Sequence, residues 1–169
     1  MVPFFLLVLN IILLAISWIM LVYAYPRLPA DIPLWLALGG DNFLYPKSLL
    51  IFLYPLGETL FNLLFLKLAR VKLFSKQWKS SLDKTPPSPA QSKERLRIEF
   101  AFLAMIFFNL IFIHVERSLI LVAHRVEKGV NPFYFLMLFL VLLMLIPYYR
   151  IREIAERKQW LIKSKKRKK

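Results

Sequence analysis

Residues 3–25, PFFLLVLNIILLAISWIMLVYAY, decide the fold, because this stretch contains no charged side chain. A helix needs about 20 consecutive apolar residues to cross the hydrocarbon core of a bilayer. Three later stretches are similar, and Glu58 is the only charged residue in them. They cover residues 48–66, 100–115 and 129–149. The sequence therefore predicts a polytopic membrane protein with four transmembrane helices.

Composition supports an all-α fold and argues against several kinds of chemistry. The chain has 169 residues, of which 59% are hydrophobic, and only four glycines. It lacks the two-residue alternation of a β-barrel, so helices are the way to satisfy its backbone in lipid. The absence of cysteine excludes disulfides and thiolate chemistry, and two histidines make a poor metal site. We expect no metal, no cofactor and no enzymatic activity.

Basic residues are sorted between alternate connections. The connection over residues 26–47 is neutral, with two basic and two acidic side chains. The connection over residues 67–97 has nine Lys or Arg against two acids, and the tail from Arg150 has ten against two. Because positive charge is retained in the cytoplasm, both termini and the middle loop are predicted to be inside. The sequence thus predicts an N-in/C-in protein of the inner (plasma) membrane.

The middle connection contains a proline-rich linker at residues 85–91, TPPSPAQ. It is predicted to separate two helical hairpins, residues 1–84 and 92–169. Before the linker, apolar residues recur among lysines with the spacing of a helix lying on a membrane surface. These residues are Val71, Phe74, Trp78 and Leu82. The basic segments predict contact with anionic lipid at the inner face, and we expect no nucleic-acid partner.

Helical rise gives the predicted depth of the intramembrane polar residues. At about 1.5 Å per residue, Glu58 and Asn109 are each expected near the midplane. The same estimate places Asn10 and Asn62 at one shared level. A buried carboxyl group in a membrane helix marks a functional candidate. Glu58 is predicted either to bind a proton or cation during transport or, when protonated, to hold the bundle together by a hydrogen bond.

A second polar group lies near the end of the third apolar stretch. It consists of His114, Glu116, Arg117 and His124. Since Glu116 falls about 27 Å from the assumed inner boundary, these side chains are expected to anchor the helix at the outer interface. The alternative is an outward-facing polar site formed by the same four residues.

The first connection resembles a bacterial membrane domain of unknown function that also occurs in SdpI-type immunity proteins. The matching features are YPRLPADIPLW at residues 25–35, Gly39-Gly40-Asp41 and Lys47-Ser48. Trp35 and Ala37 stand where that family usually has His and Asn, so the resemblance over about residues 21–66 implies topology only. Apolar side chains of this loop, including Ile32, Trp35 and Leu36, are expected either to pack at the interface or to dock a peptide or membrane-protein partner.

Two functions follow from these predictions. The first is a non-enzymatic binding or accessory component, regulatory or immunity-like, that acts through its outer loop. The second is a small secondary transporter or channel subunit that uses Glu58.

Overall fold

The computed structural model describes residues 2–36, 42–68 and 89–167. Its four long helices are α1 (Val2–Ala24), α2 (Leu53–Leu68), α4 (Pro89–Ala123) and α5 (Pro132–Arg167). Two short 3-10 helices are η1 (Tyr25–Arg27) and η2 (Leu49–Phe52). Between them, strands β1 (Asp31–Pro33) and β2 (Leu44–Pro46) form an antiparallel hairpin with Ile32 opposite Tyr45. The predicted helical architecture is confirmed, and the small hairpin is an addition to it.

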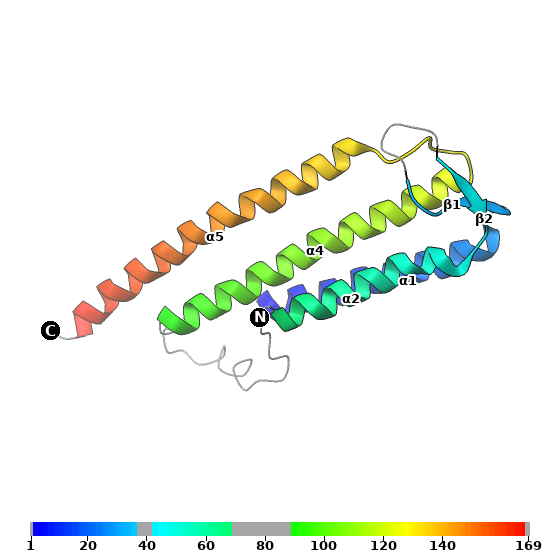
Figure 1. Cartoon of the computed structure of the whole chain (residues 1–169). Helices are drawn as coiled ribbons and strands as arrows, with labels where there is room; N and C mark the ends of the chain where they lie inside the picture. The colour runs from blue at the N-terminus through cyan, green and yellow to red at the C-terminus, as the bar shows by residue number, and fades with distance from the viewer. Residues whose placement is uncertain (1, 37–41, 69–88, 168–169) are drawn as a thin grey trace.

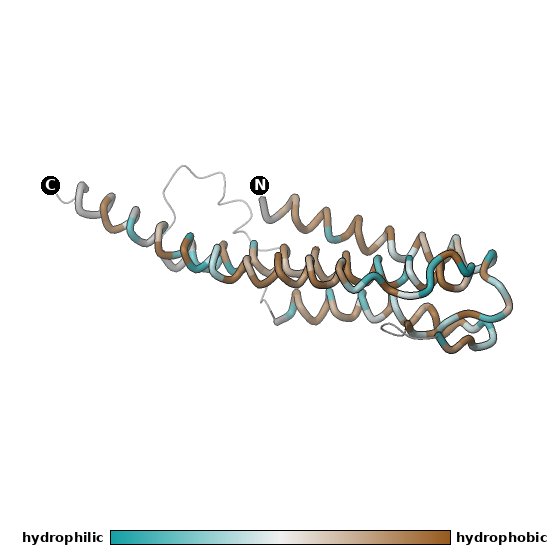
Figure 2. Tube along the Cα trace, turned by 90° about the horizontal axis from the view of Figure 1, so that it is seen from above, coloured by the Kyte–Doolittle hydropathy of each residue, from teal (hydrophilic) through white to brown (hydrophobic). Residues whose placement is uncertain are grey.

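All four long helices are long and apolar enough to cross a membrane. The candidate spans are Phe4–Arg27, Leu49–Lys67, Lys93–Ala123 and Pro132–Ile162. Hydrophobic residues dominate along the bundle, while α5 becomes more polar toward the C-terminus (Figure 2). The prediction of four helices that are long and apolar enough to cross a membrane is confirmed.

The helices alternate in direction along one long bundle (Figure 1). The start of α1, the end of α2 and the start of α4 lie toward one end, and α5 extends beyond them. The β hairpin and the turn between α4 and α5 lie at the opposite end, here called the lid end. Consequently α1 and α4 run parallel to one another, and α2 and α5 run in the other direction.

Helix α4 is the centre of the packing. It contacts α1 most extensively and also packs against α2 and α5, whereas α1 and α2 contact each other less. The packing therefore does not divide at the predicted boundary between two hairpins. Helix α5 packs chiefly on α4 and leaves much of its apolar surface exposed, including Met144 and Ile151. That exposure is consistent with the predicted position of this helix at the edge of the bundle.

Proline and polar caps mark several helix ends. Pro26 converts the end of α1 into η1 because it has no amide hydrogen to continue the helix. Pro89 and Pro132 are each the first residue of a helix. At this position the missing amide hydrogen would have had no partner within the helix. The Asn131 side chain accepts a hydrogen bond from the Phe133 amide at 3.0 Å and so caps α5. At the other end of that turn, Arg125 follows α4 with a φ of 59°.

The connection between α1 and α2 folds into a lid over the bundle. Lys47 ties it down: its ammonium group donates to the carbonyl of Leu28 at 3.1 Å, and its amide donates to that of Ala30 at 2.6 Å. Ser48 then caps η2 by accepting from the Leu50 amide. The lid side chain Ile32 is fully buried. The Lys-Ser pair noted in the sequence thus has a local structural role in closing this loop.

One predicted feature has a different boundary in the structure, and two others lie outside the described residues. The proline-rich linker was expected through residue 91, but α4 already begins at Pro89. The amphipathic segment around Val71, Phe74, Trp78 and Leu82 lies outside the described residues, as does the Gly39-Gly40-Asp41 motif. The last helix, α5, continues beyond Tyr149, and Arg152 pairs with Glu156 one turn further on at 3.4 Å.

Candidate functional site

Two polar layers lie inside the bundle where α1, α2 and α4 meet. Ser17 follows Asn10 by seven residues in α1, and Glu116 follows Asn109 by seven in α4. Both pairs across the two helices are 99 residues apart in the chain, so α1 and α4 keep one parallel register through both layers. A seven-residue repeat is the spacing that keeps side chains on one helix–helix seam. By helical rise the layers are about 10 Å apart.

The first layer contains three asparagines joined in a chain. Asn62 donates to the Asn109 side chain at 2.7 Å, and Asn109 donates to the Asn10 side chain at 3.0 Å. Asn10 in turn donates to the carbonyls of Leu6 and Phe102. Every one of these amides is buried and has a partner. This asparagine layer therefore ties α1, α2 and α4 together with satisfied hydrogen bonds.

The second layer contains Ser17, Glu58 and Glu116, all 0% exposed. The Ser17 hydroxyl lies 2.8 Å from both carboxyl oxygens of Glu116 and donates to that group. Glu58 is close enough to interact electrostatically with Glu116 and with Ser17. The Ser17 hydroxyl also lies near Glu58, but neither Glu58 oxygen meets the geometry of a hydrogen bond with any described residue. This carboxyl layer is therefore polar, buried and incompletely hydrogen-bonded within the described residues.

Apolar clusters close the bundle on both sides of these layers. At the lid end, Leu21, Leu28, Ile32, Ile51 and Ala123 form one buried cluster. At the opposite end, Leu6, Phe102, Met105 and Ile106 form another. The clusters continue the same seam, because Ala123 lies seven residues beyond Glu116 and Phe102 seven before Asn109. The carboxyl layer is thus separated from either end of the bundle by packed hydrocarbon.

Helical rise predicted one of the two polar levels correctly. Asn10 and Asn62 share a layer as expected, but Asn109 joins them there instead of lying level with Glu58. The error arises from the assumption that the first helix begins at Pro3 and the third at Ile98, with both residues at the same membrane boundary. The observed register aligns Pro3 with Phe102, a shift of about 6 Å, or one turn. Asn62 does lie beside Glu58 on α2, and its side chain donates to the Glu58 carbonyl at 2.8 Å.

The polar group expected at the outer interface does not form one site. Glu116 is wholly buried beside Ser17, contrary to the predicted interfacial position, because the register places it one heptad from Asn109. His114 stacks on Tyr134 of α5 with ring centres 4.0 Å apart. Arg117 pairs with Glu127 at 3.8 Å, and His124 is exposed. These four side chains therefore do not share one site, although His114 and Arg117 lie close enough to interact electrostatically.

The three outer-loop residues also have different surroundings. Ile32 lies in the apolar cluster beneath the lid and is not available to a partner. Trp35 remains 52% exposed and packs against Tyr45, with ring centres 4.9 Å apart. Leu36 is partly buried. The lid thus packs through Ile32 and presents an aromatic side chain through Trp35.

A contact between α4 and α5 was not predicted. Arg152 binds the buried carboxylate of Glu99 at 2.9 Å, and Tyr149 packs edge-on against Phe100. The signal in the sequence is an acid just before one apolar stretch, Glu99, and an arginine shortly after another, Arg152. These positions are brought together when the helices are antiparallel.

No group of three His, Cys, Asp or Glu side chains that could hold a metal ion occurs within residues 2–36, 42–68 and 89–167. The chemistry open to the carboxyl layer is therefore the binding of a proton or a small cation by two carboxyl groups and a hydroxyl. The absence of a cofactor remains a prediction.

Comparison with known proteins gives no further assignment. No family model, curated protein or solved structure matches the chain. The resemblance to the SdpI-type membrane domain therefore stays a prediction.

The asparagine layer predicts energetic coupling between Asn62 and Asn109. In a double-mutant cycle with Asn62→Ala and Asn109→Ala, we expect a coupling free energy of about 0.5–2 kcal/mol, because each truncation removes the same hydrogen bond. Unfolding in detergent micelles measures it. Asn131, which caps α5 far from this layer, is the matched control, and the cycle of Asn62→Ala with Asn131→Ala should show no coupling. Equal coupling in both cycles would contradict the layer.

Proposed function

We propose that this chain is a small proton-coupled transporter or channel subunit, which binds and releases a proton at Glu58 and Glu116. The observation that carries the proposal is the state of Glu58. Its side chain is fully buried, neither oxygen has a hydrogen-bond partner among the described residues, and a second buried carboxyl group lies nearby.

Electrostatics favours a proton in this layer. Two ionised carboxylates close together in an apolar bundle would repel one another and would each lose their hydration. Neither Glu58 nor Glu116 takes part in an ion pair within the described part of the chain. A proton held by the pair removes most of that cost, and the two groups then titrate as a unit.

The two layers differ in a way that separates a functional role from a purely structural one. The asparagine layer already joins α1, α2 and α4, and its hydrogen bonds are complete. The Glu58 side chain adds no such bond, although its burial is costly. A carboxyl group whose oxygens remain free is suited to accept a proton or a cation that arrives and leaves. A proton is favoured over a metal ion because a third acidic or histidine ligand is missing from the described residues.

The membrane orientation belongs to the same proposal. We infer an inner-membrane protein with both termini in the cytoplasm, since the basic residues concentrate in the middle connection and the tail. The lid then faces outward. A proton entering from outside would pass the apolar cluster at Ile32, and one entering from the cytoplasm would pass the cluster at Phe102.

A second candidate function rests on the exposed aromatic surface of the lid. Trp35 is 52% exposed and Phe43 is 70% exposed, which suits docking of a peptide or a membrane-protein partner. This would be the regulatory, immunity-like or accessory role predicted from the outer loop. In that case Trp35→Ala would abolish partner binding, and substitution of Glu58 would leave it unchanged.

The proposal predicts proton movement that depends on both buried acids. In proteoliposomes with an imposed pH gradient, the purified protein should accelerate the decay of that gradient, followed with an enclosed pH-sensitive dye. Glu58→Gln and Glu116→Gln should each reduce the rate by at least about tenfold, because positioned proton-transfer groups contribute that much or more. Both substitutions keep the shape of the side chain and remove its titration.

Glu127→Gln serves as the matched control, since Glu127 lies in the turn after α4 and pairs with Arg117 outside the bundle. It should leave the rate unchanged. A rate equal to that of empty liposomes for the wild-type protein, or full activity in Glu58→Gln, would overturn proton coupling and favour the docking function.

Orientation is tested by labelling single cysteines, since the natural chain has none. Lys128→Cys at the lid end should react with a membrane-impermeant maleimide on intact cells. Arg95→Cys near the start of α4 should react only after permeabilisation. Both positions are exposed, so access to reagent depends on the side of the membrane. The opposite pattern would refute the N-in/C-in orientation.

A further inference from the structure

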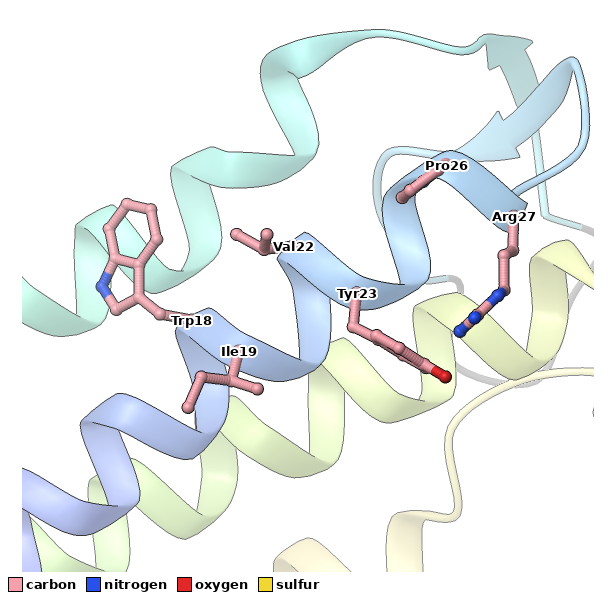
Figure 3. Close-up of a pocket in the computed structure, with 6 residues that line it drawn as sticks. All are labelled: Trp18, Ile19, Val22, Tyr23, Pro26 and Arg27. Carbon is pink, nitrogen blue, oxygen red and sulfur yellow. The ribbon is translucent and has the colours of Figure 1, made fainter.

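A groove runs along α1 and η1 on the outside of the bundle, near the lid end (Figure 3). Its volume is about 560 Å³. The residues that line it are Trp18, Ile19, Val22, Tyr23, Pro26 and Arg27. Five of the six present apolar or aromatic surface, and the sixth carries a positive charge. None of these side chains belongs to the carboxyl layer, so the groove is a separate feature.

The inner end of the groove is held in place by contacts with α2. The Trp18 indole donates to the Thr59 hydroxyl at 3.1 Å, and that hydroxyl donates to the Pro55 carbonyl at 2.7 Å. The indole also stacks against Phe52 with ring centres 6.4 Å apart. The aromatic wall is therefore fixed before any ligand binds, which lowers the entropic cost of binding.

The other end of the groove carries an unneutralised cation. The Arg27 guanidinium lies 3.7 Å from the centre of the Tyr23 ring, and the two side chains lie alongside one another in Figure 3. Arg27 is exposed and has no ion-pair partner among the described residues. It is also the last residue of the first candidate membrane span. A cation at that position lies where lipid headgroups begin.

We propose that this groove binds one anionic phospholipid at the lid end of the bundle. The lipid phosphate pairs with Arg27, and one acyl chain lies along Val22, Ile19 and Trp18. The ten residues from Trp18 to Arg27 span about 14 Å of helix, so the groove extends from the headgroup region into the hydrocarbon. The charge at one end and the apolar wall along the rest together fit an anionic amphiphile. This site is at the opposite end of the bundle from the end of α2 and the start of α4.

Native mass spectrometry of the full chain tests the proposal. Protein released from mixed micelles containing equal phosphatidylglycerol and phosphatidylcholine should retain one phosphatidylglycerol in preference. Arg27→Gln should reduce that preference about fivefold, the effect expected of one basic residue near a membrane surface. Val22→Trp, which fills the groove without changing charge, should reduce retention of both lipids.

Lys128→Gln is the charge-matched control, since Lys128 is exposed at the same end but lies outside the groove. It should leave retention unchanged. Glycerol phosphate, which has the charged group without acyl chains, should not displace the lipid. Equal retention of the two lipids by the wild-type protein, an equal effect of Lys128→Gln and Arg27→Gln, or displacement by glycerol phosphate would overturn the proposal.

Discussion

Two hydrogen bonds hold α1 and α4 in one parallel register. One runs from Ser17 to Glu116, and the other runs from Asn109 to Asn10, seven residues earlier in each helix. Both helices are apolar over most of their length, and apolar surfaces in lipid give little preference for one register over another. Buried polar groups do give that preference, because a shift of one residue would leave them without partners. The central position of α4 and the positions of the two apolar clusters along the bundle axis follow from this register.

Helix α2 completes both layers but contributes to them unequally. Asn62 enters a hydrogen-bonded chain, whereas Glu58, one turn away, reaches the carboxyl layer with neither oxygen bonded. The stability of the bundle can therefore rest on the asparagines while the acids remain able to exchange a proton. The apolar clusters on either side set the condition for that exchange, since one of them must open before water can reach the pair.

Sequence alone predicted the helical class, the four candidate spans and the burial of Glu58, because each follows from local composition. It did not predict the partners of Glu58, since these depend on register between helices distant in the chain. Because the third helix was assumed to enter the membrane at Ile98, Glu116 was predicted to lie one turn too close to the outer interface. The seven-residue spacing shared by Asn10 with Ser17 and Asn109 with Glu116 contained the missing information. The buried position of Ile32 under the lid likewise depends on long-range packing that loop composition does not specify.

The central claim is that Glu58 and Glu116 hold a proton between them inside the bundle, and infrared spectroscopy of the carboxyl C=O stretch tests it most directly. Protein in lipid at neutral pH should show a protonated carboxyl band that Glu58→Gln and Glu116→Gln each alter and their combination removes. Absence of a protonated carboxyl band from the wild-type protein, or persistence of the same band in the double variant, would contradict the account.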